Sequence, residues 1–376
     1  MSPTDEIQQV LRQKGFTVFD PGILTEVHSK AIVVEYSQKM QEVYDRFCSQ
    51  VTKAPLQITT CLTNDLSLDA FIGKLSRPHS FLISLNYGIF ANLYACFMGL
   101  LACPEILPHI GDSRNTHCMY TTVDYGLTDF TYHNRVVKKN TPVSLGFPLW
   151  NYPKDEERIL YALLLFDIAF EFIMYHEWGH LLGGHLSFLN QQYHADGISE
   201  INDRSQSTHT YTIDGEPIRK VMEFEADYIA ASMICSLPYH LQTTHRSFFQ
   251  AYPRDFLSKY DPRDAIFFSI LSLFHLLEEV RRRKRRHNSN LYPSLYYRFC
   301  SLVYCLYNER ESETRHLWKG YDYRGVIDFV KTTQILKFNY SFAKYAYDEH
   351  ATGRHLLKLD DQLTKLRQHL ALFRLI

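Results

Sequence analysis

The sequence predicts an α+β protein that is mostly α-helical, and three observations support this prediction. Apolar residues make up 45% of the 376 residues and charged residues 22%, which are the values of a globular chain with a packed core. Segments with strand-like composition all lie before residue 150. From residue 155 onward, apolar residues recur at helical spacing through most of the remaining sequence.

The first 150 residues are predicted to mix helices with strands, because alternating or β-branched segments follow helical ones. We expect helices over residues 5–14 and 25–51 and strands over residues 56–62 and 80–85. The stretch 104–153 is rich in Pro, Gly, Asn and Asp, which predicts loops with short strands at 130–133 and 143–146.

Residues 87–103 form the most membrane-like stretch that we identify in the sequence. This stretch is near the ~17-residue lower limit for a membrane span. It also contains Gly88, Asn92 and Gly99. We therefore interpret it as a buried core helix and expect no membrane span, with a membrane-associated protein as the alternative.

The second half is predicted to be helical. One or two helices are expected over residues 155–189, and within them the stretch 159–174 is apolar nearly all round, which indicates burial on most faces. After a polar loop at 201–215, a second strong helix is expected over 218–235 and ends before Pro238. Further helices are expected over residues 262–284, 294–308, 324–336 and 354–373.

Charge and cysteine content restrict the function classes. Forty basic residues against 41 acidic ones give a formal net charge of −1, which argues against nucleic-acid or anionic-membrane binding driven by global charge. The eight cysteines include no CxxC pair, as expected for free thiols in a reducing compartment. The polar, acidic start of the sequence does not resemble a secretion signal. We therefore expect a soluble, cytoplasmic protein.

The segment His176-Glu177-Trp178-Gly179-His180 has the spacing of a metal site. Residues four apart on a helix share a face, so both imidazoles can reach one ion. Glu177 is rotated away from that pair and can address a water molecule in an open coordination position. This is the HExxH arrangement of zinc hydrolases, in which the glutamate is the catalytic base.

A third ligand is expected from the segment Glu223-Phe224-Glu225-Ala226-Asp227. Glu223 and Asp227 share a helix face, whereas Glu225 points nearly the opposite way. Glu223 can then bind the metal, and Asp227 can accept the spare N–H of a ligand histidine. The alternative is an acidic helix face that binds nothing. Small residues, Ala226, Ala230 and Ala231, would let this helix approach the HExxH helix closely.

His185 competes with Glu223 for the place of the third ligand. In the metzincin pattern HExxHxxGxxH, the third histidine follows the second by six residues. Gly183 fits that pattern, but residue 186 is Leu and the histidine is at 185. We therefore interpret His185 as a packing or hydrogen-bonding residue.

The HEWGH segment followed by EFEADYIA resembles the gluzincin metallopeptidases, and among them the HtpX group and the soluble phage-exclusion peptidases of the Lit type. The resemblance covers about 60 residues. It implies a zincin-like helical core with Zn2+ held by His176, His180 and Glu223, with Glu177 as catalytic base and Asp227 behind the ligands. A histidine five residues after the motif also recurs in the HtpX group, which favours a non-ligand role for His185.

A weaker similarity lies in the segment 292–298. The HtpX group often has His-Pro followed by Arg five residues after the proline. Here Tyr292 replaces the histidine, and Arg298 is the arginine. The similarity implies that Arg298, with Tyr292, stabilises a developing oxyanion. A helix-face salt bridge is the alternative for Arg298.

The basic run 281–286 follows a helix whose apolar residues end at Val280. Cations suit the negative end of a helix, so a solvated helix end is one interpretation and docking of an acidic partner or nucleic acid is the other. Six adjacent cations cannot all be buried and paired. We expect this run to be exposed and dispensable for the chemistry.

Together these observations divide the chain into three regions. Residues 1–153 form a mixed recognition or regulatory region, residues 154–310 the metallopeptidase core, and residues 311–376 a C-terminal helical region. We predict a zinc endopeptidase that cleaves an intracellular protein, in phage defence or as a regulated toxin, with a substrate strand added near residues 80–86. The alternative is a regulatory zinc-binding protein that acts by binding a partner.

Overall fold

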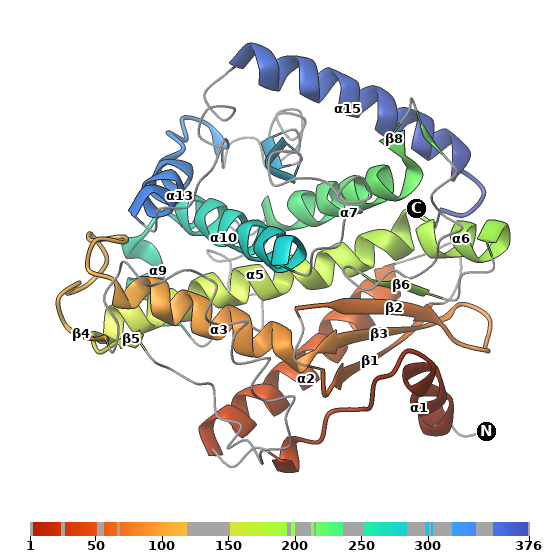
Figure 1. The fold of residues 1–376 in the computed structure, drawn as a ribbon, viewed down its shortest axis with the longest axis horizontal. Helices are drawn as coiled ribbons and strands as arrows, with labels where there is room; N and C mark the ends of the chain where they lie inside the picture. The colour runs from red at the N-terminus through yellow and green to blue at the C-terminus, as the bar shows by residue number, and fades with distance from the viewer. Residues whose placement is uncertain are drawn as a thin grey trace.

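The structure is a computed structural model. It describes residues 3–23, 27–50, 56–65, 68–118, 151–193, 197–199, 212–213, 216–235, 252–283, 298–300, 302–303, 318–335 and 349–374. Helices dominate this part of the chain, and a small mixed sheet accompanies them (Figure 1). The predicted class, α+β and mostly α, is confirmed. The strands predicted at 130–133 and 143–146 lie outside the described residues.

The N-terminal region has the mixed character that its sequence predicts. Its elements are α1 (Pro3–Gln13), η1 (Pro21–Ile23), α2 (Val27–Gln50), β1 (Gln57–Thr63), β2 (Ala70–Lys74), β3 (Ser80–Asn86), α3 (Tyr87–Ala102), β4 (Thr116–Cys118) and β5 (Asn151–Pro153). All but one residue of α3 are buried, so its apolar sequence serves the core as expected.

The second half is helical apart from three short strands. Its elements are α5 (Glu156–Leu182), α6 (His185–Tyr193), β6 (Gly197–Ser199), β7 (Thr212–Ile213), β8 (Glu216–Pro217), α7 (Ile218–Cys235), α9 (Arg254–Lys259), α10 (Pro262–Arg283), α13 (Arg324–Ile335) and α15 (Glu349–His369). Helix α7 has the predicted bounds. Helix α10 includes the first three residues of the basic run, whose side chains lie outside the description, and the expected exposure of 281–286 stays a prediction.

The main sheet has the strand order β1-β3-β2-β6. Strand β3 pairs in parallel with β1 and antiparallel with β2, while β6 is antiparallel to β2. Both edges of β3 are therefore occupied, and the prediction that a substrate strand pairs at residues 80–86 is wrong. An added strand needs free backbone N–H and C=O groups, which a central strand does not have.

Helix α5 is the central element, and α2, α3, α7 and α10 pack around it (Figure 1). Asp155 caps its first turn by accepting a hydrogen bond from the Arg158 backbone N–H at 3.0 Å. The buried Arg158 guanidinium donates to the backbone carbonyl of Leu101 in the last turn of α3. It also donates to carbonyls of the loop that follows, at Cys103, Ile106, Leu107 and Ile110. These bonds fix the start of α5 against the end of α3.

Among the described helices, α5 is long and apolar enough to cross a membrane by length and composition, and 83% of its most apolar window is buried inside the protein. Buried core helices pass the same test, so this observation is weak evidence for a span. The sequence analysis singled out residues 87–103 as the most membrane-like stretch and did not recognise α5 as another. The ends of α5 are charged, but its stretch 159–175 has only Asp167 and Glu171 as charged residues.

Helices α5 and α7 approach closely at Gly179. A Cβ atom added at Gly179 would lie 2.9 Å from Ala226 Cα, which is a backbone atom and cannot move aside as a flexible side chain can. Ala226, Ala230 and Ala231 are all buried, as the small residues of α7 predicted. This contact brings HEWGH and EFEAD face to face.

We predict that Gly179→Ala destabilises the protein by about 1–2 kcal/mol. Overpacking against backbone costs roughly 1–3 kcal/mol, which exceeds the gain of about 1 kcal/mol that alanine brings to a helix interior. Chemical denaturation of both proteins measures the difference. A variant as stable as the wild type would show that α5 and α7 can move apart freely.

Asp167 is a buried carboxyl on α5 that sits between two tyrosines. The Tyr252 hydroxyl donates to Asp167 Oδ2 at 2.6 Å, and the Tyr36 hydroxyl donates to Oδ1. Burial raises the pKa of Asp167 from 3.8 to about 7, although the two hydroxyl donors oppose this shift. The folded protein therefore holds this proton more tightly than the unfolded chain does.

We predict that Asp167 makes stability fall as pH rises. Because its pKa is raised on folding, the contribution of Asp167 to the free energy of unfolding is fully present below about pH 4. It is lost progressively up to about pH 7, at ~1.4 kcal/mol per pH unit. Between about pH 5 and about pH 8, the free energy of unfolding of Asp167→Asn should therefore fall by about 3 kcal/mol less than that of the wild type. Chemical denaturation at both pH values measures the difference. Asp361→Asn is the control, because Asp361 is an exposed acid that pairs with Lys365 on α15. Parallel pH profiles for wild type and Asp167→Asn would contradict the assignment.

Candidate metal centre

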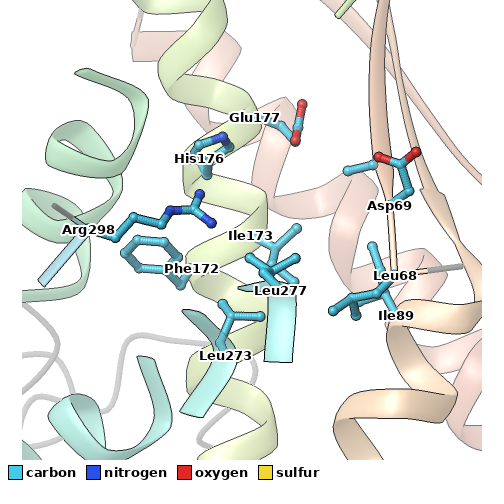
Figure 2. A pocket seen from close by; sticks show the side chains of 11 residues that line it. Leu68, Asp69, Ile89, Phe172, Ile173, His176, Glu177, Leu273, Leu277 and Arg298 are labelled. Carbon is cyan, nitrogen blue, oxygen red and sulfur yellow. The ribbon is translucent and has the colours of Figure 1, made fainter. Parts of the chain in front are cut away.

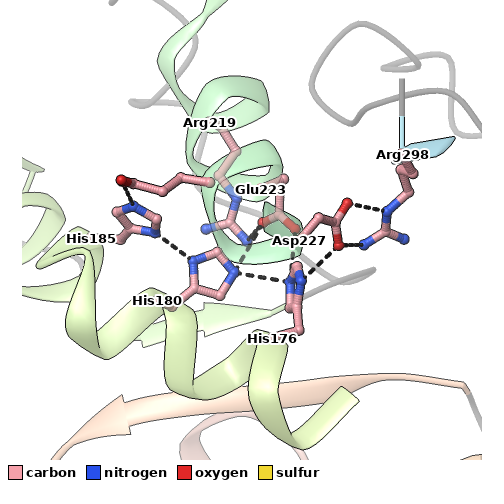
Figure 3. A network of polar contacts seen from close by, with 8 residues as sticks. His176, His180, His185, Arg219, Glu223, Asp227 and Arg298 are labelled. Atoms are coloured by element: carbon pink, nitrogen blue, oxygen red, sulfur yellow. Dashed lines mark hydrogen bonds and ion pairs between the residues drawn. The ribbon is translucent and has the colours of Figure 1, made fainter. Parts of the chain in front are cut away.

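Helix α5 presents His176 and His180 on one face, as their spacing predicts. Both side chains are buried, and their Nε2 atoms lie 3.2 Å apart (Figure 3). Trp178, on the opposite face, stacks on Phe47 of α2 and contacts Tyr44. The aromatic contact holds the back of the helix, so the two imidazoles are aimed at α7.

Glu223 of α7 completes the group. Its Oε2 atom lies 3.3 Å from His176 Nε2 and its Oε1 atom 3.6 Å from His180 Nε2. One ligand atom from each of the three residues lies within 4.8 Å of the others, so this buried group can hold a metal ion. No other such group of His, Cys, Asp or Glu side chains occurs among the residues that the structure describes.

The environment of Glu223 fits a cation. The residue is fully buried, and neither of its oxygens accepts a hydrogen bond of normal geometry. Burial would raise the pKa of Glu223, but Arg219 and the two histidines more than offset this and lower it. A buried carboxylate needs positive charge close to it; Arg219 supplies one, and a cation bound between Glu223 and the two imidazoles would supply more.

The protonation states of the two histidines also favour positive charge next to Glu223. Burial opposes charge on His176, yet its contacts with Asp227 and Glu223 raise its pKa to about 10. Burial lowers the pKa of His180, which is therefore neutral. One positive charge is thus favoured next to Glu223, at the place where the three ligand atoms converge.

Arg219 is a site residue that the sequence analysis missed. It lies one turn before Glu223 on α7, and its guanidinium is 2.7 Å from Glu223 Oε1. The contact orients the carboxylate and leaves Oε2 beside His176. The i, i+4 spacing of Arg219 and Glu223 was the available signal, but such pairs are common on solvated helices and do not indicate a buried site.

Asp227 and Arg298 stand behind His176. Asp227 Oδ1 lies 2.9 Å from His176 Nδ1, the position in which a carboxylate fixes the ring of a ligand histidine. Arg298 donates from Nε to Asp227 Oδ2 at 2.7 Å and from a terminal nitrogen to Oδ1 at 2.9 Å. Its guanidinium also lies 4.7 Å from the ring of Phe274. Arg298 therefore makes a buried ion pair across elements and not the helix-face salt bridge of the alternative interpretation.

A small pocket of about 20 Å³, enough for about one water molecule, lies beside His176 (Figure 2). Glu177 and Arg298 line it together with Asp69, and its remaining lining is apolar, from Leu68, Ala70, Ile89, Phe172, Ile173, Leu273 and Leu277. The structure thus brings Glu177 and Arg298 to one cavity with His176. Tyr292 lies outside the described residues, so its predicted role stays a prediction.

His185 does not face the point where the three ligand atoms converge. Its Nδ1 atom lies 2.8 Å from His180 Nδ1, on the side of that ring away from Glu223 (Figure 3). Its Nε2 atom lies 3.0 Å from Glu225 Oε2. His185 is therefore a buried hydrogen-bonding residue, and Glu225 is a partner that the sequence analysis left unassigned.

Comparisons with known proteins add no relative. No family model matches the chain, and neither the curated proteins nor the solved structures include a significant match. The interpretation of the site therefore depends on its own geometry.

We predict that Glu223→Gln weakens metal binding by more than the roughly 10–100-fold that loss of a residue behind the ligands costs, because it removes a negatively charged ligand. His176→Ala and His180→Ala should do the same. Competition with a chelator measures the dissociation constant for Zn2+ and for Co2+. Asp361→Asn, an exposed acid on α15, is the control. Unchanged affinity in Glu223→Gln would remove this residue from the ligand set.

Proposed function

We propose that this protein is a zinc-dependent endopeptidase. The observation that supports the proposal is the convergence of His176, His180 and Glu223 beside a pocket that also contains Glu177. Two imidazole nitrogens and one carboxylate oxygen are the ligand set of a catalytic zinc site, which keeps a fourth position for water or substrate. Structural zinc sites are closed by four protein ligands and have no use for an adjacent glutamate.

Zinc, when bound, supplies a Lewis acid and lowers the pKa of a coordinated water. Glu177 follows His176 directly on α5 and lines the same pocket. We assign it the role of general base, which would accept the proton of the attacking water and pass it to the leaving amine. Asp227 keeps His176 in the orientation that directs Nε2 to the ion.

Arg298 is the group that we assign to the developing oxyanion. Its pairing with Asp227 fixes the guanidinium, and it lines the pocket beside His176 (Figure 2). A donor held in place before the reaction stabilises new negative charge without reorganising.

The metal centre is enclosed. His176 is 3% exposed and Glu177 2% exposed, so a polypeptide substrate needs the surrounding helices to open. This supports the expectation that activity is restrained until a trigger acts. An intracellular protein substrate, a cytoplasmic location and a role in phage defence or as a toxin rest on the sequence alone and stay predictions.

A regulatory zinc-binding protein is the second candidate function, and the same burial favours it. A sealed site can stabilise one conformation for a partner without turning over a substrate. The two functions differ in their need for Glu177, because a purely structural site requires the ligands but not the base.

We predict that Glu177→Gln retains Zn2+ and the fold but loses cleavage by at least about a hundredfold, the usual contribution of a general base. His176→Ala should lose both the metal and the activity. Proteomics of cells expressing wild type or Glu177→Gln measures the fragments, and metal analysis of the purified proteins measures the zinc. Identical fragment patterns, with function lost only in His176→Ala, would favour the regulatory protein.

A further inference from the structure

A second series of contacts leads away from the metal centre through His180. Its Nδ1 atom is 2.8 Å from His185 Nδ1, and His185 Nε2 is 3.0 Å from Glu225 Oε2. All three side chains are buried. Whereas His176 contacts its carboxylate Asp227 directly, His180 reaches its carboxylate through a second imidazole.

The partners determine the direction of these hydrogen bonds. His180 turns Nε2 toward His176 and Glu223, so the hydrogen of its neutral ring lies on Nδ1 and is donated to His185 Nδ1. His185 then accepts at Nδ1 and donates from Nε2 to Glu225. Each nitrogen thus has one role, and the geometry fixes the orientation of His180.

Glu225 is held by two arginines from the C-terminal segment. Arg367 of α15 donates from Nε to Glu225 Oε1 at 2.9 Å, and Arg374 donates from a terminal nitrogen to the same oxygen at 2.7 Å. Burial opposes ionisation, but His185 and Arg374 outweigh it and lower the pKa of Glu225 to about 2. The carboxylate beside His185 is therefore charged and anchored.

Two glycines make room for this arrangement directly after the HEWGH helix. A Cβ atom at Gly183 would lie 2.5 Å from His185 Nε2. At Gly184, where φ is +75°, a Cβ atom would lie 2.5 Å from the Phe373 carbonyl carbon. The ring of Phe373 also contacts Phe188 of α6. The His185 ring thus packs against Gly183, and the segment that carries Arg374 packs against Gly184.

We propose that His185 and Glu225 are positioning residues for the metal ligand His180, and that Arg367 and Arg374 make metal affinity depend on the C-terminal segment. An acceptor behind a ligand histidine fixes its ring and raises its basicity, which strengthens its bond to a metal. The proposal rests on the metal centre proposed above and does not depend on proteolysis.

The experiment measures Zn2+ and Co2+ dissociation constants by chelator competition and records the visible spectrum of the Co2+ protein. His185→Leu should weaken binding about 10–100-fold. His185→Gln, which keeps one acceptor and one donor, should recover part of the loss. Glu225→Gln and Arg374→Ala should weaken binding by about 2–30-fold. Lys365→Ala is the matched control, because Lys365 lies on the same helix and pairs with the exposed Asp361.

Thermal unfolding of each protein without metal separates positioning from packing. Loss of metal affinity and a changed Co2+ spectrum in variants that unfold within a few degrees of the wild type support the proposal. If His185→Leu fails to fold, Glu225→Gln and Arg374→Ala decide the matter. Wild-type affinity in both would overturn the proposal and leave the metal centre intact. A wild-type protein that binds neither ion would overturn both.

Discussion

The backbones of α5 and α7 meet at Gly179 and Ala226, and the metal centre depends on this contact. In most packed helix pairs the side chains at the contact keep the axes 8–10 Å apart. Here the absence of a Cβ on one helix and a single methyl on the other let short histidine and glutamate side chains reach a common point. The strongly packed outer faces of both helices then prevent that point from widening.

The buried acidic side chains of α7 each require a positive charge close by, and each has an arginine partner. Each of its three acidic side chains, Glu223, Glu225 and Asp227, meets arginine, from α7 itself, from the C-terminal segment and from residue 298 respectively. An isolated buried carboxylate would cost several kcal/mol, whereas a paired one costs much less. Four arginines thus face three carboxylates, so the buried acids of α7 leave no uncompensated negative charge.

Local sequence patterns predicted the features that one helix can encode. The i, i+4 phase placed His176 with His180 and Glu223 with Asp227, and the boundaries of α7 followed from its apolar period. The prediction also recognised that His185 is out of register for a ligand. These features depend on residues within one or two turns of each other, where helical geometry is fixed.

The features that were missed depend on contacts between distant segments. Strand β2 is short and contains Gly73, and β6 has three residues, so neither has a clear alternating pattern. Without β2, strand β3 looked like an available edge. Glu225 was correctly oriented away from Glu223, but its partners Arg367 and Arg374 lie far along the chain, and no local signal connects them. The late position of Arg367 and Arg374 has a consequence for synthesis. A growing chain carries the HEWGH helix and Glu225 long before the two arginines that anchor this carboxylate have left the ribosome.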